Sequence, residues 1–507
     1  MANKIDSNAT GLRFAEEASL GVLIGSPIWY PLEPNSYNDF GGQIATVART
    51  PISATRQNKK GTTTDLDASG GWNQDLTMSN LTRLLQSFFF AAARQKVTNY
   101  PLASVGVAMG AILASADDYT AASGLSGILS GALIYASGFS VSANNGLKVA
   151  NAASSGTAAS VADGLADEAT PPAAAKIEVV GHEFASATMD IAMNGSLVRL
   201  SRVSGAFDLT TLPLIVGEWI YLGDDTAGNR FVNNVGFARI SAIATTYLEF
   251  DKTSWAGVNE AGTGKLIRIY FGTVIRNEPS AANIVRKTVQ LERTLGNDAN
   301  GTMSEYIVGA VANELTLNIP TADKVAVDLS FVGIDNEQRD GTTGVKSGSR
   351  PALAPESALN TSSDFSRIKL SSVSITNANV TPLFAFASDI KLTVNNNVSA
   401  NKAIGTLGAF DTTAGNFDVN GTMEVYFADI AAVQAVRNNA DITLDFAIVK
   451  DNKGILFDIP LIALGDGRLN VEKDQPIKLP LSTNAAESAY GYTLLFTAFP
   501  YLPTLAA

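Results

Sequence analysis

Paired carboxylates are the residues of this chain whose types and spacing come nearest to the catalytic groups of an enzyme. Asp65 and Asp67 stand two positions apart, so both side chains point to one face if the segment is a β-strand. Two carboxylates, one of them acting as an acid, are the groups that glycosidases use. No neighbouring residue marks a substrate cleft. We therefore expect no active site, although a carboxylate glycosidase with accessory β modules stays open as an alternative.

Two acidic clusters have side chains of the kind that ligate calcium. Asp224 and Asp225 form one, and Asp163, Asp167 and Glu168 form the other. Neither cluster has the loop spacing that ends in a bidentate glutamate. We therefore predict solvated turns at both places, with no bound metal or other cofactor.

The segment Gly262–Lys265 (Gly-Thr-Gly-Lys) is similar to the end of a phosphate-binding loop. Such a loop requires a first glycine where this chain has Asn259, and it holds magnesium with a serine or threonine where this chain has Leu266. These two departures argue against a nucleotide site.

The chain has one histidine and no cysteine, so few sites could use the chemistry of either residue. His182 is the only histidine, which argues against a Ser-His-Asp triad, and we expect it at a turn or a strand edge. The absence of cysteine excludes disulfides and thiolate zinc sites.

A formal net charge of -12 argues against binding nucleic acid by phosphate neutralisation. At 507 residues, the chain is long enough for several domains.

The segment 416–465 predicts antiparallel strands with one helix. Asp429–Asn439 has an apolar side and predicts the helix, with Asp429 as its N-cap, and Lys450–Gly454 predicts a tight turn. Apolar and polar residues alternate, as in strands with one buried face, in three segments: Gly421–Phe427, Asp441–Val449 and Ile455–Ile459. The predicted fold class is all-β, built from β-sandwich or barrel domains that each carry one flanking helix.

Four parts of this region also resemble a known family: Asn395–Asn397, the glycines at 405 and 408, Asn420–Phe427 and Phe457–Pro460. They resemble the major tail tube proteins of long-tailed (siphovirus-type) bacteriophages. In that family a β-sandwich with a flanking helix joins its neighbours' sheets into a ring, and stacked rings form the tube. The resemblance implies a non-enzymatic virion protein that is made in the host cytoplasm. It also implies partner proteins, such as the tape measure and the tail terminator, and DNA that is present only in transit.

The order of a long hairpin followed by a helix occurs twice, at 43–92 and at 390–439. In the first copy, Gly70 and Gly71 predict a bend or bulge, and a helix is expected at Ser79–Ala92. The repeated order suggests two fused tube-like domains. Because members with one such domain form six-membered rings, we favour trimeric rings with pseudo-sixfold symmetry. Hexameric rings are the alternative if residues 1–334 only elaborate one domain.

Residues 106–276 interrupt the first domain and contain an internal repeat. Gly131–Tyr135 matches Gly217–Tyr221, and Asn144–Leu147 matches Asn233–Phe237. We expect two small β modules, outside the tube and dispensable for its assembly. If they bind glycans, the chain would instead be a surface-layer or adhesive β protein. The expected organisation is an extended N-terminal arm (1–35), a first tube-like domain (36–105 with 277–334), the two inserted modules (about 106–170 and 176–276), a linker (335–365) and a second tube-like domain (366–507).

Two sets of residues are expected to act in assembly. A channel that lets DNA pass should be neutral or acidic, because attraction would hold the DNA. The candidates for the channel wall are Thr64, Asp65, Asp67, Asn416, Asp418 and Asn420. The candidates for contacts between rings are Arg56, Lys59, Lys60, Trp29 and Tyr30, although the last two are equally consistent with a core aromatic pair. No membrane segment is expected, since the uncharged segment Tyr119–Leu147 is rich in glycine and serine and predicts strands and turns.

Overall fold

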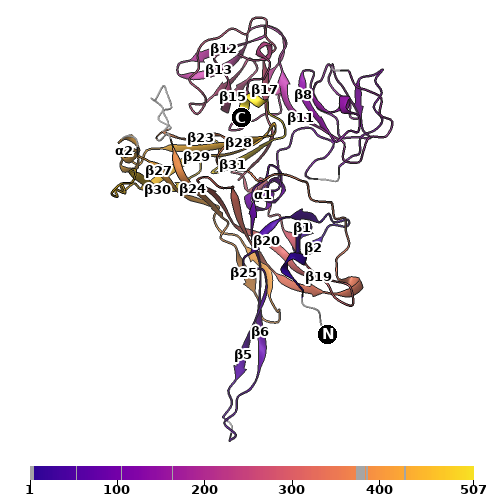
Figure 1. The fold of residues 1–507 in the computed structure, drawn as a ribbon, viewed down its shortest axis with the longest axis vertical. Helices are drawn as coiled ribbons and strands as arrows, with labels where there is room; N and C mark the ends of the chain where they lie inside the picture. The colour runs from indigo at the N-terminus through magenta and orange to yellow at the C-terminus, as the bar shows by residue number, and fades with distance from the viewer. Residues whose placement is uncertain are drawn as a thin grey trace. The chain divides into compact units, whose positions relative to one another are not determined.

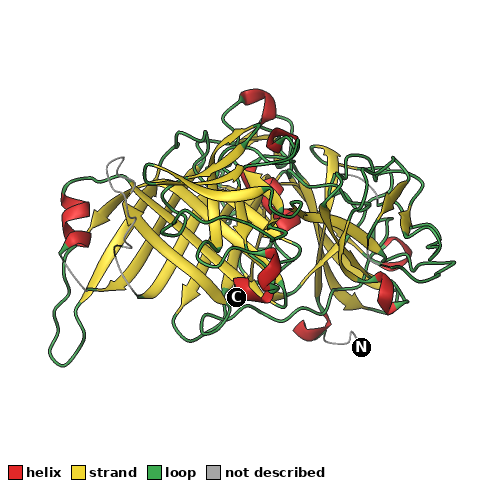
Figure 2. Ribbon diagram, turned by 90° about the horizontal axis from the view of Figure 1, so that it is seen from above, coloured by secondary structure: helices red, strands yellow, loops and turns green. Residues whose placement is uncertain are grey.

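The computed structural model describes residues 5–52, 54–103, 106–162, 164–372, 383, 386–427 and 430–507. Its regular structure is almost entirely β-strand (Figure 2), with two short α-helices in these residues, α1 (Thr82–Phe89) and α2 (Ala431–Arg437). The predicted all-β fold is therefore confirmed, and each helix lies within its predicted range. The expected N-cap of α2, Asp429, lies outside the described residues. Neither helix is long and apolar enough to cross a membrane.

The chain folds into two compact units, each assembled from three separate segments. Unit 1 comprises residues 1–91, 277–361 and 388–424, and unit 2 comprises residues 92–276, 362–387 and 425–507. These units do not coincide with the domains expected from the sequence. The expected insertion and most of the expected second tube-like domain lie together in unit 2.

Unit 1 is organised around β20 (Thr302–Pro320), a strand of 19 residues that belongs to two sheets. Its first half pairs with β19 (Val289–Asn297) and β22 (Asp335–Arg339), and its second half pairs with β21 (Ala326–Gly333) and β24 (Ala387–Asn395). Gly309, with φ of 58°, lies where the partners change. The remaining strands are β1 (Gly11–Ser19), β2 (Val22–Leu23), β3 (Tyr30–Leu32), β4 (Pro34–Tyr37), β5 (Gly41–Arg49), β6 (Lys59–Asp75), β25 (Ser399–Lys402), β26 (Ala409–Thr413) and all but the last two residues of β27 (Asp418–Tyr426).

The N-terminal residues belong to the sheet and do not form the expected extended arm. β1 pairs with β19 on one side and with β3 on the other, and Leu12 and Phe14 are buried. Pro31 lies in β3, whose only ladder among the described residues is with β1, so the proline is on an edge strand. The expected linker at 335–365 likewise begins as a paired strand, β22.

Helix α1 packs on unit 1 through its predicted apolar stripe, whose five members are all buried: Leu81, Leu84, Leu85, Phe88 and Phe89. The Phe88 ring meets the edge of Phe331 on β21 at 5.2 Å, and Trp72 on β6 stacks on Phe331 at 5.4 Å. The helix therefore closes the core against the middle of the sheet.

Gly70 and Gly71 do not form the predicted bulge. The register of β6 on β21 runs unbroken through both glycines. A Cβ atom at residue 71 would lie 2.1 Å from the carbonyl oxygen of Asn38, and one at residue 70 would lie 2.4 Å from a methyl carbon of Leu291. Both positions are glycine because other atoms approach the backbone too closely for a side chain.

Unit 2 contains two large sheets and a small two-stranded one. The first runs β23–β28–β29–β31–β18, with β30 pairing on the end of β29. Its strands are β18 (Thr273–Arg276), β23 (Phe365–Ser372), β28 (Ile442–Lys450), β29 (Lys453–Asp466), β30 (Lys478–Ala485) and β31 (Leu495–Phe499). β28 and β29 are joined through Asp451 and Asn452, both with positive φ, in a two-residue turn that lies within the predicted turn segment Lys450–Gly454.

The second sheet belongs to the insertion and has the order β12–β13–β16–β15–β14–β17–β11–β8–β9. Its strands are β8 (Ala132–Ser137), β9 (Gly146–Val149), β11 (Lys176–Glu183), β12 (Met189–Asn194), β13 (Leu197–Arg202), β14 (Trp219–Leu222), β15 (Gly236–Ala244), β16 (Tyr247–Phe250) and β17 (Arg268–Tyr270). A separate pair joins β7 (Asp118–Thr120) to β10 (Ala158–Ser160). The segment 119–147 thus forms strands and turns, as predicted.

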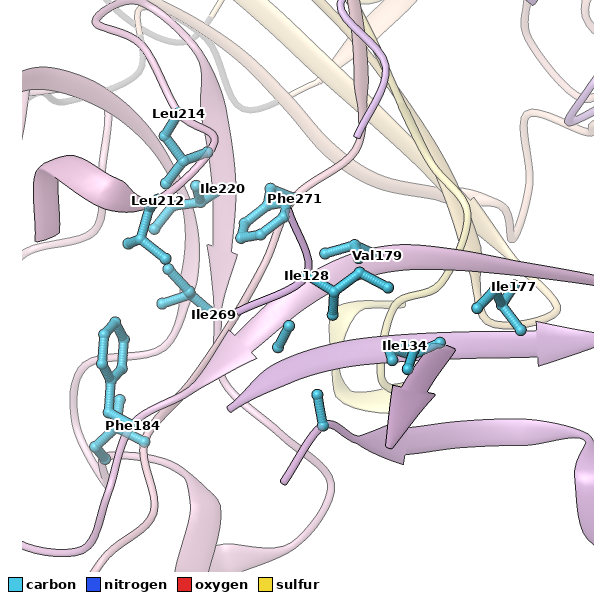
Figure 3. Packing of buried hydrophobic residues seen from close by; sticks show 14 of the residues in the cluster. Ile128, Ile134, Ile177, Val179, Phe184, Leu212, Leu214, Ile220, Ile269 and Phe271 are labelled. Atoms are coloured by element: carbon cyan, nitrogen blue, oxygen red, sulfur yellow. The ribbon is translucent and has the colours of Figure 1, made fainter. Parts of the chain in front are cut away.

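The middle of the insertion's sheet is buried on both faces. One face forms the insertion's own core, where Ile134, Val179, Ile220 and Ile269 lie close together (Figure 3). The alternate residues turn to the other face, and they pack against the sheet of β28–β31 in one cluster that includes Leu133, Val180, Trp219, Tyr270, Val449, Leu456 and Leu495. The insertion therefore does not fold apart from the rest of unit 2, because it covers apolar residues of β28, β29 and β31. Its dispensability for tube assembly stays a prediction.

Candidate functional site: exposed hairpins and a buried charge network

The hairpin of β5 and β6 extends as a two-stranded ribbon beyond the sheet of unit 1 (Figure 1). β6 pairs with β21 only from Ala68 onward, so the strand from Lys59 to Asp67 has β5 as its partner. Every residue of β5 after Gly41 is exposed, including Ile44 and Val47 with 58% and 57% of their surface accessible. Apolar side chains that are this exposed on a ribbon are typical of a surface that another protein covers.

A second hairpin, β25–β26, lies beside the first within unit 1. Lys402 at its edge donates to both carboxylates of β6, with Nζ 2.5 Å from Oδ1 of Asp67 and also in contact with Asp65. The hydrogen bond from Lys402 lowers the pKa of the Asp65 carboxyl and raises the pKa of Lys402 itself. Ile404, Leu407 and Phe410 on this hairpin are exposed.

The predicted channel residues all reach solvent, but they form two groups. Thr64 and Asp67 are exposed and Asp65 is partly exposed, and the two aspartates share Lys402, which the sequence analysis did not single out. Asn416, Asp418 and Asn420 are exposed on and before β27, while Val419 between them is buried. Nδ2 of Asn397 donates to Oδ2 of Asp418 at 2.8 Å and to the carbonyl oxygen of Asn416 at 3.0 Å. Their position on a channel wall stays a prediction.

The five candidates for contacts between rings separate in the structure. Arg56, Lys59 and Lys60 are exposed at the tip of the first hairpin. Trp29, in contrast, is fully buried, donates from Nε1 to the carbonyl oxygen of Ser347 at 3.0 Å and meets the ring of Tyr306 edge-on at 5.5 Å. Tyr30 is partly buried beneath the guanidinium of Arg83. The core alternative thus describes Trp29, and the basic tip remains the candidate contact.

The acidic clusters serve the fold. Asp224 accepts hydrogen bonds from the Tyr270 hydroxyl at 2.6 Å and from Nη1 of Arg268 at 3.0 Å. Asp225 accepts hydrogen bonds from the backbone N–H groups of Thr504 and Leu505, at the start of the short 3-10 helix Thr504–Ala506. Asp163 lies outside the described residues.

The glycines of Gly262–Lys265 belong to a turn. The N–H of Gly262 donates to Oδ1 of Asp190 at 2.9 Å, and Nζ of Lys265 lies 3.4 Å from Oε1 of Glu260. The lysine therefore pairs with a carboxylate of its own chain.

A charge network is buried between the two sheets of unit 2. Arg239 on β15 donates from Nη1 to both carboxylate oxygens of Asp458 on β29, at 2.8 and 3.1 Å, and from Nε to Asp251 at 2.5 Å. The hydroxyls of Tyr492 and Tyr490 donate to Asp458 and Asp251 respectively, each at 2.9 Å. This network ties the insertion to the neighbouring sheet with charge-assisted hydrogen bonds.

In this network, burial and the attraction between the guanidinium and the carboxylates shift the pKa values in opposite directions. Burial acts to lower the pKa of Arg239, but the carboxylates of Asp251 and Asp458 raise it well above its usual range. Burial raises the pKa of Asp458 although Arg239 opposes the shift, whereas Arg239 and Thr253 hold the pKa of Asp251 below its usual value despite burial. The guanidinium is therefore the group on which both buried carboxylates depend.

His182 is a buried residue of β11 and does not lie at a turn. Its ring stacks on Phe207 at 4.6 Å and meets Phe184 edge-on at 4.8 Å. Burial lowers the pKa of His182 to about 4. Sequence position alone could not distinguish this aromatic environment from an exposed strand edge.

We expect the stability of unit 2 to fall as the pH drops from 6.5 towards 4, because the unfolded histidine takes up a proton that the folded one excludes. Between pH 7.5 and pH 4.5 this group alone should remove about 2–3 kcal/mol of unfolding free energy. The His182→Phe variant should lack that part of the pH dependence. Urea unfolding of both proteins at the two pH values gives the difference, and parallel losses would contradict the assignment.

Long exposed hairpins on an all-β scaffold, with the candidate carboxylates engaged in structural contacts, define an all-β structural protein. A family model described as phage tail tube protein matches residues 7–212 and 244–485. The match covers more than half of the chain, and the chain belongs to the phage tail tube protein family. It is thus a structural subunit of the virion tail, from a generally non-enzymatic family whose members polymerise. No curated protein matches the sequence.

Proposed function

We propose that this subunit polymerises into stacked rings that enclose the channel for DNA during genome ejection. The observation that carries the proposal is the β5–β6 hairpin, a 17-residue strand and its partner that leave apolar and basic side chains uncovered in the single chain. Burial of these side chains against further copies would supply the driving force for assembly. The tape measure and tail terminator proteins are the further partners that this role implies.

The channel wall is proposed to include the return strands β6 and β27. Asp67, Asp418 and Asn420 are exposed, and the described part of β27 carries no basic residue. An acidic wall repels the phosphate backbone and a neutral wall does not attract it, so in either case DNA passes without being held. Lys402 reduces the negative charge beside β6, which moderates that repulsion.

A trimeric ring is favoured over a hexameric one. The support for it is the repeated order of long hairpin and helix, which places α1 after β5–β6 and α2 after β24–β27. We expect native mass measurement of isolated rings to give three times the chain mass of 53.0 kDa. Rings of six full chains would contradict a second working tube domain in each chain. If electron microscopy shows only monomers and these bind glycans, the adhesive alternative would replace the tube.

A further inference from the structure

The insertion contains the same hairpin twice. On β8 and β9, Leu133 pairs with Val149 and Ala136 pairs with Gly146. On β14 and β15, Trp219 pairs with Arg239 and Leu222 pairs with Gly236 in the same register. Each hairpin is preceded by a glycine with positive φ whose N–H donates across the strands, from Gly131 to Ala150 at 2.7 Å and from Gly217 to Ile240 at 2.8 Å.

A clamp made by a buried asparagine and a glutamate is found in each copy, with the asparagine following the hairpin's first strand. In the first copy, Nδ2 of Asn144 donates to Oε2 of Glu168 at 2.9 Å, and the N–H groups of Ser140 and Val141 donate to the two oxygens of that carboxylate. In the second copy, Nδ2 of Asn234 donates to Oε2 of Glu260 at 2.8 Å. The carboxylate of Glu260 accepts from two successive N–H groups as well, those of Val232 and Asn233.

The matches extend to the backbone around each glutamate. Oδ1 of each clamp asparagine accepts an N–H two residues before its glutamate, from Ala166 in one copy and from Val258 in the other. Each glutamate also exchanges backbone hydrogen bonds with an isoleucine, Glu168 with Ile112 and Glu260 with Ile191. Agreement of register, side chains and backbone bonds at so many points is more than similar strands alone would give.

The two copies face each other across the strands that follow them. β11 pairs with β8 as β17 pairs with β14, and β11 and β17 pair antiparallel with one another. Exchanging the copies maps this pairing onto itself, so a pseudo-twofold axis passes between β11 and β17. The symmetry stops at β18, which pairs with β31, and at β11, where the carbonyl oxygen of Val97 accepts a hydrogen bond from the N–H of Val179.

We propose that residues 106–276 are two copies of one duplicated module, closed into a pseudo-twofold pair, and that only the second copy has acquired the buried ion pairs that join the insertion to the sheet of β28 and β29. The anchor residues Trp219, Arg239 and Asp251 stand where the first copy has Leu133, Val149 and Ala162. The equivalence of the last pair follows from matched backbone bonds, from Asp251 to Arg239 and from Ala162 to Val149. None of the three residues of the first copy carries a charge, so the buried ion pairs belong to the second copy alone.

The clamp is tested by hydrogen exchange of the full-length chain. In the wild type, the amides of 140, 141, 232 and 233 should all be protected. Glu168→Gln replaces one acceptor oxygen with a donor and should speed exchange at 140 and 141 by at least about tenfold, and Glu260→Gln should do the same at 232 and 233. Unprotected amides at either site in the wild type, or a response to only one of the two variants, would overturn the equivalence of the copies.

The anchor is tested by a matched pair of variants at equivalent positions, Val149→Gln and Arg239→Gln. We expect Arg239→Gln to speed exchange in β28 and β29 by at least about tenfold, whereas Val149→Gln, which removes an apolar contact but no ion pair, should speed it by a clearly smaller factor. If Arg239→Gln does not fold while Val149→Gln does, the asymmetry is supported as well. Equal effects of both variants on β28 and β29 would refute it.

Discussion

Replacing Arg239 with methionine should prevent unit 2 from holding its native structure. The substitution leaves Asp458 and Asp251 buried without the cation that balances them, and Asp458 has no exposed surface. Removing one partner of a buried ion pair costs about 3–5 kcal/mol. That loss is a large fraction of the total stability of most domains, which is about 5–15 kcal/mol. Urea unfolding followed by circular dichroism measures it.

The control for this prediction is the same substitution at a surface pair. Arg339→Met removes a partner of Glu337, where both side chains are about one-third exposed, and should cost at most about 1 kcal/mol. A triple variant, Arg239→Met with Asp251→Asn and Asp458→Asn, should recover part of the lost stability because no buried charge is left alone. If Arg239→Met is as stable as Arg339→Met, the network does not hold the two sheets together.

Shortening the β5–β6 hairpin should abolish tube assembly without unfolding the subunit. Replacing residues 48–61 with Asn-Gly joins Val47 to Thr62, which already face each other in the hairpin. The deletion keeps Asp65 and Asp67 with Lys402 but removes Ile52 and the basic tip. Each apolar side chain withdrawn from an interface forfeits about 1.5–3 kcal/mol, or roughly 10- to 100-fold in affinity. Sedimentation and electron microscopy of the purified variant measure assembly.

Two comparisons make the hairpin result interpretable. The thermal unfolding of the unassembled variant should match that of the unassembled wild type, because the described residues among those removed are exposed, apart from the partly buried Gly61. A charge-reversed tip with Arg56, Lys59 and Lys60 changed to glutamate keeps the hairpin's length and tests the basic tip separately. Normal tubes from the shortened variant would show that the hairpin is not an assembly contact.

Local patterns predicted the local elements well. The stripe from Leu81 to Phe89 gave α1 because helical periodicity can be read within one short segment. The turn at Asp451–Asn452 gave the β28–β29 hairpin because those residue types tolerate positive φ. The family was also evident from such short segments, above all Asn420–Phe427.

Contacts between distant residues were not predictable in the same way. β1 was expected to be part of an extended arm because the residues around Gly11 do not indicate that this strand pairs with β19, where Gly11 lies opposite Thr294. Arg239 and Asp458 form one network, yet each alone looks like an ordinary charged residue of a strand. Gly71 was predicted as a bulge because the sequence does not show that the carbonyl of Asn38 lies against it.

The interleaving of the two units determines when the chain can fold during synthesis. β31 (Leu495–Phe499) lies between β18 and β29 in the sheet and pairs with both. β18 is therefore synthesised more than 200 residues before the strand with which it pairs. Until β31 emerges from the ribosome, β18 lacks its ladder partner and the face of the insertion's sheet is without its full cover. A nascent or truncated subunit that lacks β31 is therefore incomplete in unit 2. The order of synthesis thus delays completion of unit 2 until β31 has been made.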